Sequence, residues 1–358
     1  MNRYSRHIIL SEVGQEGQAK LLKAKVLVVG AGGLGCPALQ YLTASGIGTI
    51  GIIDFDIVEE SNLQRQVLFG TSTLGKNKAI ASKTRLEDLN STITINAYPE
   101  KLTSKNALDL FKKYDIIIDG TDNFTTRYLI NDVAILTNKP VVYAAIYKFE
   151  GQVSVFNYQN GPSYRCLFPN PPKEGSVANC SEVGVLGVLT GIIGSMQANE
   201  VIKIILGFRD VLSGKLFCYN AKTSQTTTLK INRNDSEFKK VLKQKNNLKA
   251  LHEDISCETL IQEITAEDTL EKKQVMFIDV RESYEQPELN IPKCFNIPLS
   301  QLVDNLNQIN SKHTNIFVCQ SGIRSKKAVR IAQEHGITNC YSLKGGISEL
   351  IQLFKIKI

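Results

Sequence analysis

The sequence contains little that would place the protein in a membrane or outside the cell. The segment Met1–His7 leads into an apolar run that is too short for a signal peptide, so we expect a cytoplasmic protein. The most apolar stretch, 183–207, is interrupted by Gln197, Glu200 and Lys203, which favours a buried helix over a membrane span. Without an export signal, the eight cysteines are expected to be thiols rather than a disulfide framework.

Features of nucleic-acid-binding proteins are also missing. The net charge of +7 is mildly basic, but there is no arginine-rich run and no interleaving of basic and aromatic residues. A solvated lysine-rich surface explains the charge more simply, so we expect no nucleic-acid partner. The sequence also has no internal repeat and no low-complexity tract. Its hydrophobic fraction of 42% and charged fraction of 22% are typical of a globular protein.

The 358 residues are enough for two domains. Residues 1–235 alternate strand-like and helix-like patterns, which predicts a doubly wound, Rossmann-like, mostly parallel α/β sheet. Residues 236–254 are polar and lysine-rich, as in a linker or a solvated helix, and 255–358 predict a small second α/β domain. The predicted strands are 26–29, 49–53, 92–97, 115–118, 141–145, 152–157, 215–220, 226–231, 275–279, 315–318 and 339–343, and the predicted helices are 37–43, 76–89, 107–112, 127–137, 257–264 and 325–335.

A glycine-rich loop near the N-terminus organises the first domain. The buried strand 26–29 runs into the loop Gly30–Gly35, and a helix follows directly. Glycines let the backbone approach a ligand closely, and the helix N-terminus attracts phosphate. Asp54 ends the next strand, about 20 residues beyond the glycines, where a ribose hydroxyl is commonly held. These residues predict a nucleotide site without identifying the nucleotide.

Basic residues that follow this acid favour a triphosphate. Arg65 and Lys78 have no obvious use in a dinucleotide dehydrogenase, whereas an enzyme that neutralises three phosphates needs such cations. Asp122 follows the strand 115–118 and is therefore expected beside the glycine loop. A nicotinamide-dependent oxidoreductase stays open as an alternative, although it leaves Arg65, Lys78 and Asp122 without roles.

Further motifs are Tyr4-Ser5-Arg6-His7-Ile8, Asp54-Phe55-Asp56, Ser61–Gln66, Asp122-Asn123, Arg165–Pro169 and Cys180–Gly187. With the glycine loop and Lys78, they make residues 1–235 resemble the MoeB/ThiF family, relatives of the ubiquitin-activating enzymes. The resemblance implies ATP-dependent adenylation of the C-terminal glycine of a ubiquitin-like sulfur-carrier protein of the MoaD or ThiS type.

The resemblance also implies roles for individual residues. Gly33 and Asp54 are expected to hold adenosine, and Arg65 and Lys78 to hold the phosphates. Asp122 is expected to bind the Mg²⁺ that bridges the phosphates, because a hard cation prefers carboxylate oxygen. Arg6 is expected to reach into a neighbouring subunit's site, which implies a homodimer. The remaining expected nucleotide-binding residues are Ser61, Asn62, Leu63, Gln64 and Asn123.

In the second domain, Cys319 lies between a predicted buried strand and a predicted helix. The loop Cys319–Arg324 would wrap backbone N–H groups around the sulfur, and the helix dipole would favour a thiolate. This loop is shorter than the phosphate-binding loop of related phosphatases, which argues for sulfur. Together with the segments 279–282, 296–299 and 343–347, it resembles a rhodanese domain. The tandem is similar to molybdopterin-synthase adenylyltransferases that carry a fused sulfurtransferase.

The implied reaction is adenylation, attack by a Cys319 persulfide on the acyl-adenylate, and release of a thiocarboxylate. Cys180 would resolve the acyl-persulfide by forming a disulfide with Cys319, with a passive loop cysteine as the alternative. Arg324 is expected to assist the sulfur anion. Sulfur must come from a separate donor such as a cysteine desulfurase. The carrier's pathway, molybdenum cofactor or thiamine biosynthesis, is open, and a non-catalytic carrier-binding scaffold is a further alternative.

The sequence departs from these families in two places. Many MoeB/ThiF proteins hold a structural zinc on two Cys-x-x-Cys pairs, but here the first pair is reduced to Ser163 and Cys166. The stretch 229–243 contains no cysteine, and tetrahedral zinc needs four ligands, so we expect no structural zinc. Leu350 stands where rhodanese domains often have a tryptophan, and we expect it to be a core residue.

Overall fold

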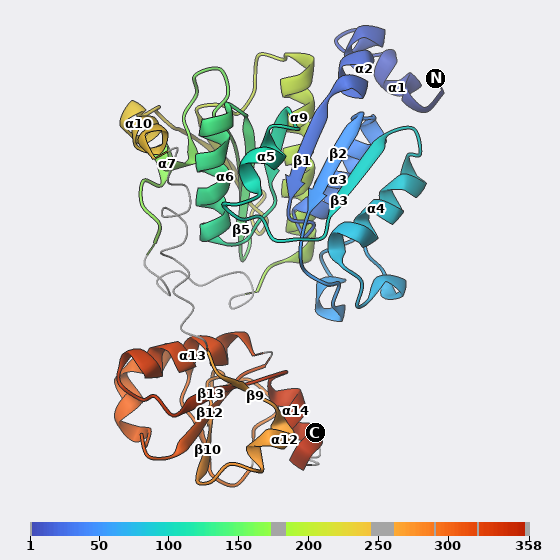
Figure 1. Cartoon of the computed structure of the whole chain (residues 1–358). Coiled ribbons are helices and arrows are strands. Elements are labelled where there is room, and N and C mark those ends of the chain that lie inside the picture. Colours follow the sequence, from blue (N-terminus) through green and yellow to red (C-terminus); the bar gives the residue numbers. More distant parts are fainter. Residues whose placement is uncertain (1, 173–183, 245–260, 290, 321, 355–358) are drawn as a thin grey trace. The chain divides into compact units, whose positions relative to one another are not determined.

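The computed structural model describes residues 2–172, 184–244, 261–289, 291–320 and 322–354. The chain divides into two compact units, Met1–Ile255 and Ser256–Ile358, which are drawn in Figure 1 and described one at a time. The expected domain boundaries stay predictions, because the residues between the two units lie largely outside the described ranges.

The first unit is built on an eight-stranded sheet with the order β3-β2-β1-β4-β5-β6-β7-β8. The strands β1 to β5 pair in parallel, whereas β6, β7 and β8 extend the sheet antiparallel, which confirms the doubly wound, mostly parallel fold. The strands are β1 (Lys25–Val29), β2 (Thr49–Ile53), β3 (Thr94–Tyr98), β4 (Ile116–Asp119), β5 (Val141–Tyr147), β6 (Glu150–Phe156), β7 (Lys215–Asn220) and β8 (Thr226–Lys230).

Helices cover both faces of this sheet (Figure 1). Along β1, Val26 and Val28 join the core beneath α3 and α9, and Leu27 and Val29 join the core beneath α5 and α6. This double burial explains why the parallel strands are continuous apolar runs. The helices are α1 (Ser5–Ile8), α2 (Gly14–Lys23), α3 (Gly35–Ser45), α4 (Lys78–Leu89), α5 (Ala107–Phe111), α6 (Phe124–Thr137), α7 (Tyr164–Leu167), α9 (Gly187–Leu206) and α10 (Asp235–Lys243), with 3-10 turns η1 (Asn2–Tyr4), η2 (Glu60–Asn62) and η3 (Thr71–Thr73).

The apolar helix α9 is long and apolar enough to cross a membrane by length and composition alone. In the structure it packs against α3, β5 and β6, and its residues Ile193, Ala198 and Val201 are buried. It is therefore a core helix of the first unit, as its interrupting polar residues predict.

The chain changes direction across the sheet at β1. It runs outward from β1 through β2 to β3 and then returns to β4 on the other side of β1. In such sheets, the carboxyl ends of the two central strands diverge and leave a crevice for a ligand. Gly30 has a φ of 91°, and a Cβ there would lie 2.9 Å from Gly120 O, so the two turns need glycine to come this close.

The helix α10 lies where the sequence predicts the start of a linker. Its residues Phe238 and Val241 pack on Ile135 of α6. The side chain of Asn234 accepts a hydrogen bond from Ser236 N at 3.1 Å and so caps the helix. The beginning of the polar stretch therefore belongs to the fold of the first unit, as a solvated helix with one apolar side.

The second unit has a five-stranded parallel sheet with the order β11-β10-β12-β13-β9. The helix α13 packs on one face, and α12 and α14 pack on the other, where Leu350 is fully buried as expected. The elements are β9 (Glu263–Ile264), α12 (Ala266–Thr269), β10 (Val275–Asp279), β11 (Cys294–Asn296), η5 (Leu299–Gln301), η6 (Val303–Gln308), β12 (Thr314–Val318), α13 (Ile323–Glu334), β13 (Cys340–Leu343) and α14 (Ile347–Phe354).

The predicted helix 257–264 is wrong at its end. Residues 263–264 form the edge strand β9, which pairs with Ser342 and Leu343, and residues 257–260 lie outside the described ranges. Pairing with β13 buries Ile264, and this tertiary contact overrides the local helical pattern.

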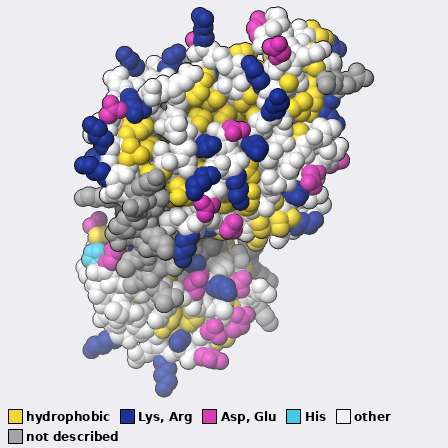
Figure 2. Space-filling model, turned by 45° about the horizontal axis from the view of Figure 1, so that its top comes forward, with side chains coloured by type: hydrophobic (Ala, Val, Ile, Leu, Met, Phe, Trp, Pro, Cys, Tyr) yellow, Lys and Arg dark blue, Asp and Glu magenta, His cyan; other side chains and the backbone are white. Residues whose placement is uncertain are grey.

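Surface charge is distributed rather than concentrated on the face drawn in Figure 2. Lys and Arg side chains are interspersed there with acidic, hydrophobic and neutral groups. The expected absence of a nucleic-acid partner stays a prediction.

Candidate active sites

A pocket of about 990 Å³ opens at the carboxyl ends of β1, β2 and β4 in the first unit. This is the crevice that the change of direction at β1 creates, and the volume includes the space open to solvent. The glycine loop forms one wall with Gly30, Gly32 and Gly33. The helix α3 begins at the end of this loop, so its N-terminus is close to the pocket.

Asp54 is held rigidly beside the glycine loop. Its Oδ2 accepts a hydrogen bond from Ala31 N at 2.7 Å, and its Oδ1 accepts one from Asp56 N at 2.9 Å. Burial raises the pKa of Asp54, and these two hydrogen bonds oppose that shift. The second lone pair of each oxygen remains available, so the carboxylate can accept a hydrogen bond from a ligand hydroxyl.

Two basic side chains also line the pocket. Lys78 is the first residue of α4, and its largely buried Nζ lies 3.2 Å from Asp56 Oδ2. Arg65 is oriented by a hydrogen bond of 2.9 Å from its Nη1 to Ser61 O. The structure therefore brings together the acid and both cations that the sequence singles out, in a pocket suited to a polyanion.

The segment 61–64 shapes the turn in front of Arg65, and none of its four residues lines the pocket. Asn62 is buried, and its Oδ1 accepts a hydrogen bond from Glu59 N at 3.1 Å. Gln64 O lies so close to Gly187 that a Cβ there would approach it to 2.4 Å. Direct binding of nucleotide by Ser61, Asn62, Leu63 and Gln64 stays a prediction, whereas the structure shows Arg65 hydrogen-bonded to the backbone carbonyls of Ser61 and Asn62.

Asp122 and Asn123 reach the pocket from the loop after β4. Asn123 caps α6, since its Oδ1 accepts a hydrogen bond from Thr126 N at 2.9 Å. The exposed carboxylate of Asp122 has no hydrogen bond or ion pair with any described residue. An unpaired carboxylate facing a polyanion pocket suits a hard divalent cation, so the residues present fit the expected Mg²⁺.

Several lining residues are absent from the sequence-based site: Gln66, Glu100, Lys101, Thr121 and Arg127. Arg127 is the most informative of them, because its Nη2 donates to Thr121 O at 2.8 Å and its guanidinium lies over the rings of Phe124 and Tyr143. It thereby holds the loop that carries Asp122. Its position one helical turn after Asn123 is the only sequence signal that could have indicated this role.

Arg6 lies away from the pocket of its own chain. The helix α1 follows Tyr4, whose hydroxyl contacts Asn90 and Thr92 near the amino end of β3. The pocket is lined by residues at the carboxyl ends of the strands, and Arg6 is not among them. The expected reach of Arg6 into a neighbouring subunit's site stays a prediction.

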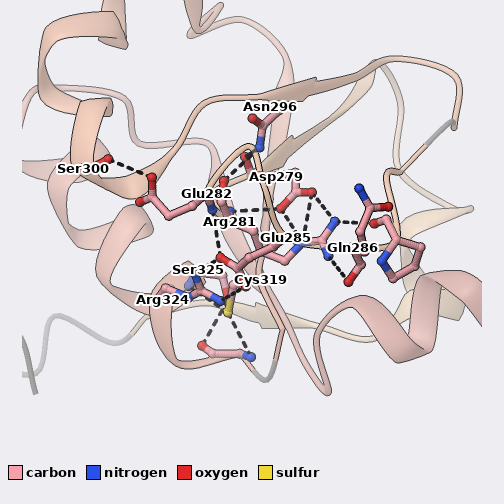
Figure 3. A network of polar contacts seen from close by, with 12 residues as sticks. Asp279, Arg281, Glu282, Glu285, Gln286, Asn296, Ser300, Cys319, Arg324 and Ser325 are labelled. Carbon is pink, nitrogen blue, oxygen red and sulfur yellow. Dashed lines mark hydrogen bonds and ion pairs between the residues drawn. The ribbon is translucent and has the colours of Figure 1, made fainter. Parts of the chain in front are cut away.

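In the second unit, Cys319 lies directly after β12 and ahead of α13 (Figure 3). Its sulfur is buried and accepts hydrogen bonds from Gly322 N at 3.1 Å and Ser325 N at 3.3 Å. The hydroxyl of Ser325 is 3.6 Å from the sulfur and 2.8 Å from Ser342 Oγ, which ties the loop to β13. The loop therefore directs N–H donors at the sulfur as expected.

Two other thiols of this unit, the buried Cys340 and the half-buried Cys294, are arranged differently. Cys340 donates its S–H to Ile337 O at 3.0 Å, and burial raises the pKa of Cys340 to about 11. Burial also raises the pKa of Cys294 to about 12. These two thiols are suited to stay protonated, whereas N–H donors at Cys319 stabilise negative charge on its sulfur. Cys319 is thus distinguished from a passive buried cysteine by its hydrogen-bond partners.

Arg324 lies beside Cys319 but is bound to Glu285. Its two terminal nitrogens contact the two carboxylate oxygens of Glu285, and the Nη2–Oε2 distance is 2.8 Å (Figure 3). This hydrogen-bonded partner lowers the pKa of Glu285 and keeps it ionised at neutral pH. No sequence motif assigned a role to Glu285.

Cys180 lies outside the described residues, so its predicted role is untested.

Cys166 is the only one of the expected zinc ligands that the sequence retains, and in the structure its sulfur contacts other protein groups. Its sulfur accepts hydrogen bonds from Ser163 N at 3.3 Å and Asn234 N at 3.2 Å. It also lies against the small apolar cluster of Ile135, Phe238 and Val241. Among the described residues, no group of three or more potential metal ligands is present. Hydrogen bonds and apolar packing thus hold α10 here.

Comparison with known proteins identifies the domain type of both units. Residues 4–241 match the family model described as ThiF family, and residues 264–352 match that of the rhodanese-like domain. The chain belongs to the ThiF family. It is similar to the probable adenylyltransferase/sulfurtransferase MoeZ of Mycobacterium tuberculosis, with 39% identity over 96% of this chain and 91% of that protein. It is also similar to the sulfur carrier protein adenylyltransferase of Thermus thermophilus, with 49% identity over 65% of this chain and 88% of that protein.

A ThiF-like solved structure shows which nucleotide this fold can accept. The structure of E. coli MccB with ATP shares 25% identity with this chain and superposes with a TM-score of 0.56. It covers 65% of this chain and 72% of its own. The protein therefore belongs to an ATP-using family of enzymes whose full-length relatives are named for both adenylyltransferase and sulfurtransferase activity.

Purified protein is expected to contain no stoichiometric zinc, because Ser163, Cys166 and the cysteine-free stretch 229–243 supply too few ligands. Elemental analysis by inductively coupled plasma mass spectrometry measures this directly. Preparation in zinc-supplemented medium with and without a chelator step is the control. One zinc per chain that survives the chelator would contradict the prediction.

Proposed function

We propose that this protein adenylates the C-terminal glycine of a ubiquitin-like sulfur-carrier protein and then converts it to a thiocarboxylate. One observation carries the proposal: a single chain combines a polyanion pocket containing Arg65, Lys78 and Asp122 with a cysteine whose sulfur accepts two backbone N–H groups. The first site suits nucleotide activation of a carboxylate, and the second suits a covalently held sulfur atom.

In the adenylation step, the carrier's carboxylate attacks the α-phosphate of ATP, and pyrophosphate leaves. Asp54 holds the ribose, and the glycine loop accommodates adenosine through Gly33. Arg65 and Lys78 neutralise charge that develops on the phosphates and on the leaving group. Lys78 is fixed at the start of α4 by Asp56, so it needs little reorganisation when the nucleotide binds.

Asp122 would hold a Mg²⁺ ion, which would supply charge neutralisation for the triphosphate. The chain's own contribution is the placement of Asp122. Arg127 binds Thr121 O, and Asn123 fixes the start of α6, so the residue between Thr121 and Asn123 has a defined position.

In the sulfur-transfer step, a Cys319 persulfide anion attacks the carbonyl carbon of the acyl-adenylate, and AMP leaves with the bonding electron pair. The product is an acyl disulfide between the carrier and Cys319. The Cys180 thiolate then attacks the sulfur of Cys319, which forms the Cys180–Cys319 disulfide and releases the carrier thiocarboxylate. A cellular reductant restores both thiols. Sulfur reaches Cys319 from a separate donor such as a cysteine desulfurase.

The active protein is a homodimer in the cytoplasm. Two observations support the dimer: Arg6 lies outside the pocket of its own chain, and the neighbouring helices α3 and α9 expose Tyr41 and Val188 by 60% and 64%. Exposed apolar side chains on adjacent elements are typical of an interface.

The carrier belongs to molybdenum cofactor or thiamine biosynthesis. Incubating the protein with ATP and each candidate carrier, and then measuring the mass of the carrier, would distinguish the two pathways.

Replacing Asp122 by Ala is expected to lower carrier-dependent ATP–pyrophosphate exchange by about 100-fold, because the metal that neutralises the phosphates loses its ligand. Isotope exchange measures this directly. Asp109→Ala removes an exposed acid from the same unit outside the pocket and serves as the control. Normal exchange in the Asp122 variant would exclude this residue from the mechanism.

Replacing Arg6 by Ala is expected to abolish exchange, because Arg6 completes the neighbouring subunit's site. Mixing this variant with Asp122→Ala should restore part of the activity, since one site of each hybrid dimer then contains both residues. Native mass spectrometry verifies subunit exchange. If hybrids form and no activity returns, Arg6 does not cross the interface.

Replacing Cys319 by Ala is expected to leave ATP–pyrophosphate exchange within about twofold of normal and to abolish thiocarboxylate formation, because no other positioned group replaces a missing nucleophile. Exchange rate and carrier mass are measured on the same preparation. Cys294→Ala, which removes another thiol of the same unit, is the control. Full thiocarboxylate yield from the Cys319 variant with a catalytic sulfur source would show that the rhodanese-like unit is not the donor.

A further inference from the structure

The active loop of the second unit contains one cation, and that cation is already neutralised. Between Cys319 and Ser325, Arg324 is the only basic residue. Both of its terminal guanidinium nitrogens contact the carboxylate of Glu285, from a segment 39 residues earlier in the chain. Paired contacts of this kind are the strongest that arginine makes with a carboxylate. Both terminal nitrogens of Arg324 are therefore occupied by Glu285, so they cannot bind a ligand while this contact persists.

The segment that carries Glu285 is fixed by a buried ion pair (Figure 3). Arg281 Nη2 donates to Asp279 Oδ2 at 2.7 Å and to Pro287 O at 2.8 Å, which folds the chain between them into a short loop. Within this loop, Glu282 N donates to Glu285 Oε1 at 2.8 Å. Glu285 is thus positioned by the fold and by Arg324, and its side chain is only 23% exposed.

The hydrogen bonds to the sulfur are made without Arg324. The two N–H donors at Cys319 come from the backbone of Gly322 and Ser325. The carboxylate of Glu282 lies on the same loop as Glu285 and accepts a hydrogen bond from Ser300 at 3.2 Å. Arg324 is therefore neutralised by Glu285 and also interacts electrostatically with a second acid, Glu282, which weakens its attraction for a small dianion.

We propose that Glu285 determines which sulfur donor Cys319 accepts. By holding Arg324, it disfavours small free anions such as thiosulfate and leaves the site suited to sulfur carried on a thiol as a persulfide. Glu285 is a positioning residue in this role, since it acts through Arg324. The inference rests on the sulfur transfer proposed above and names the donor class for it.

The two donors place different charge in the site. With thiosulfate, the Cys319 thiolate attacks the outer sulfur, the sulfur–sulfur bond breaks, and sulfite leaves with the electron pair. With a thiol persulfide, the thiolate attacks the terminal sulfur, the donor's sulfur–sulfur bond breaks, and the donor thiolate leaves. Both steps give a Cys319 persulfide, but the first combines a thiolate with a dianion. That step gains more from a free Arg324.

The test replaces Glu285 by Gln in the full-length protein and measures thiosulfate:cyanide sulfurtransfer. Glutamine keeps the size of the side chain and removes its charge, so Arg324 regains a net positive charge. We expect the KM for thiosulfate to fall about tenfold, with kcat within about twofold of normal. Glu334→Gln, at the exposed end of α13, removes the same charge away from the loop and should change neither parameter.

A second measurement uses cysteine persulfide as the donor and follows addition of one sulfur atom to Cys319 by intact-protein mass spectrometry. We expect the loading rate of Glu285→Gln to stay within about twofold of that of the unaltered protein. If the unaltered protein is not loaded by cysteine persulfide, the proposed sulfur transfer fails, whatever the Glu285 variant does with thiosulfate. Loss of loading only in the variant would instead overturn the role of Glu285 in specificity.

A double-mutant cycle with Arg324→Ala tests whether Glu285 acts through Arg324. We expect Glu285→Gln to change the KM for thiosulfate less than twofold when Arg324 is absent. An equal decrease in the KM for thiosulfate with and without Arg324 would show that Glu285 acts through its own negative charge. That result would overturn its assignment as a positioning residue. An unchanged or higher KM in the single Glu285 variant would overturn the proposal altogether.

Discussion

The close approach of two backbone turns is the constraint on which the adenylation pocket depends. A Cβ at Gly120 would lie 2.9 Å from Gly30 O, so the turns after β1 and β4 meet only because both residues are glycine. This contact sets Asp122 beside the glycine loop. On the other side, the buried Gln197 of α9 donates to Asp119 O at 2.8 Å and to Val142 O at 3.1 Å. A core helix thereby secures the backbone from which the loop of Asp122 departs.

Both sites stabilise negative charge with the same two features, a helix N-terminus and a cation that has an acidic partner. Each places the N-terminus of a helix beside the reacting group, α3 beside the nucleotide pocket and α13 beside Cys319. Each also contains a partly buried cation with an acidic partner, Lys78 with Asp56 and Arg324 with Glu285. Burying an unpaired cation is costly, so such a partner preserves the site before the substrate arrives. How strongly the acidic partner binds the cation then determines how easily a substrate anion replaces that partner.

The sequence predicted the parts of these sites that carry a recognisable motif and failed where distant segments meet without one. A strand, a glycine turn and a helix follow one another in the chain, so the pocket wall and the loop at Cys319 were predicted. Arg65, Lys78 and Asp122 come from distant segments, but family motifs and the end of a parallel strand indicated them. The contact between Glu285 and Arg324 joins residues 39 positions apart, and nothing in their local sequence indicates it. For the same reason, the strand β9 was mistaken for helix, since only its pairing with β13 defines it.

The contacts around Cys166 hold the helix α10, which begins a stretch that the sequence alone describes equally well as a linker or as a solvated helix. The stretch 232–249 is polar, yet Phe238 and Val241 form one apolar side and pack on α6. Arg233 lies 3.6 Å from the ring centre of Phe238 and covers it from solvent. The sulfur of Cys166 accepts hydrogen bonds from the backbone of Ser163 and Asn234, which joins α7 to the start of α10. Each of these contacts is made by protein groups, and together they join α10 to α6 and α7.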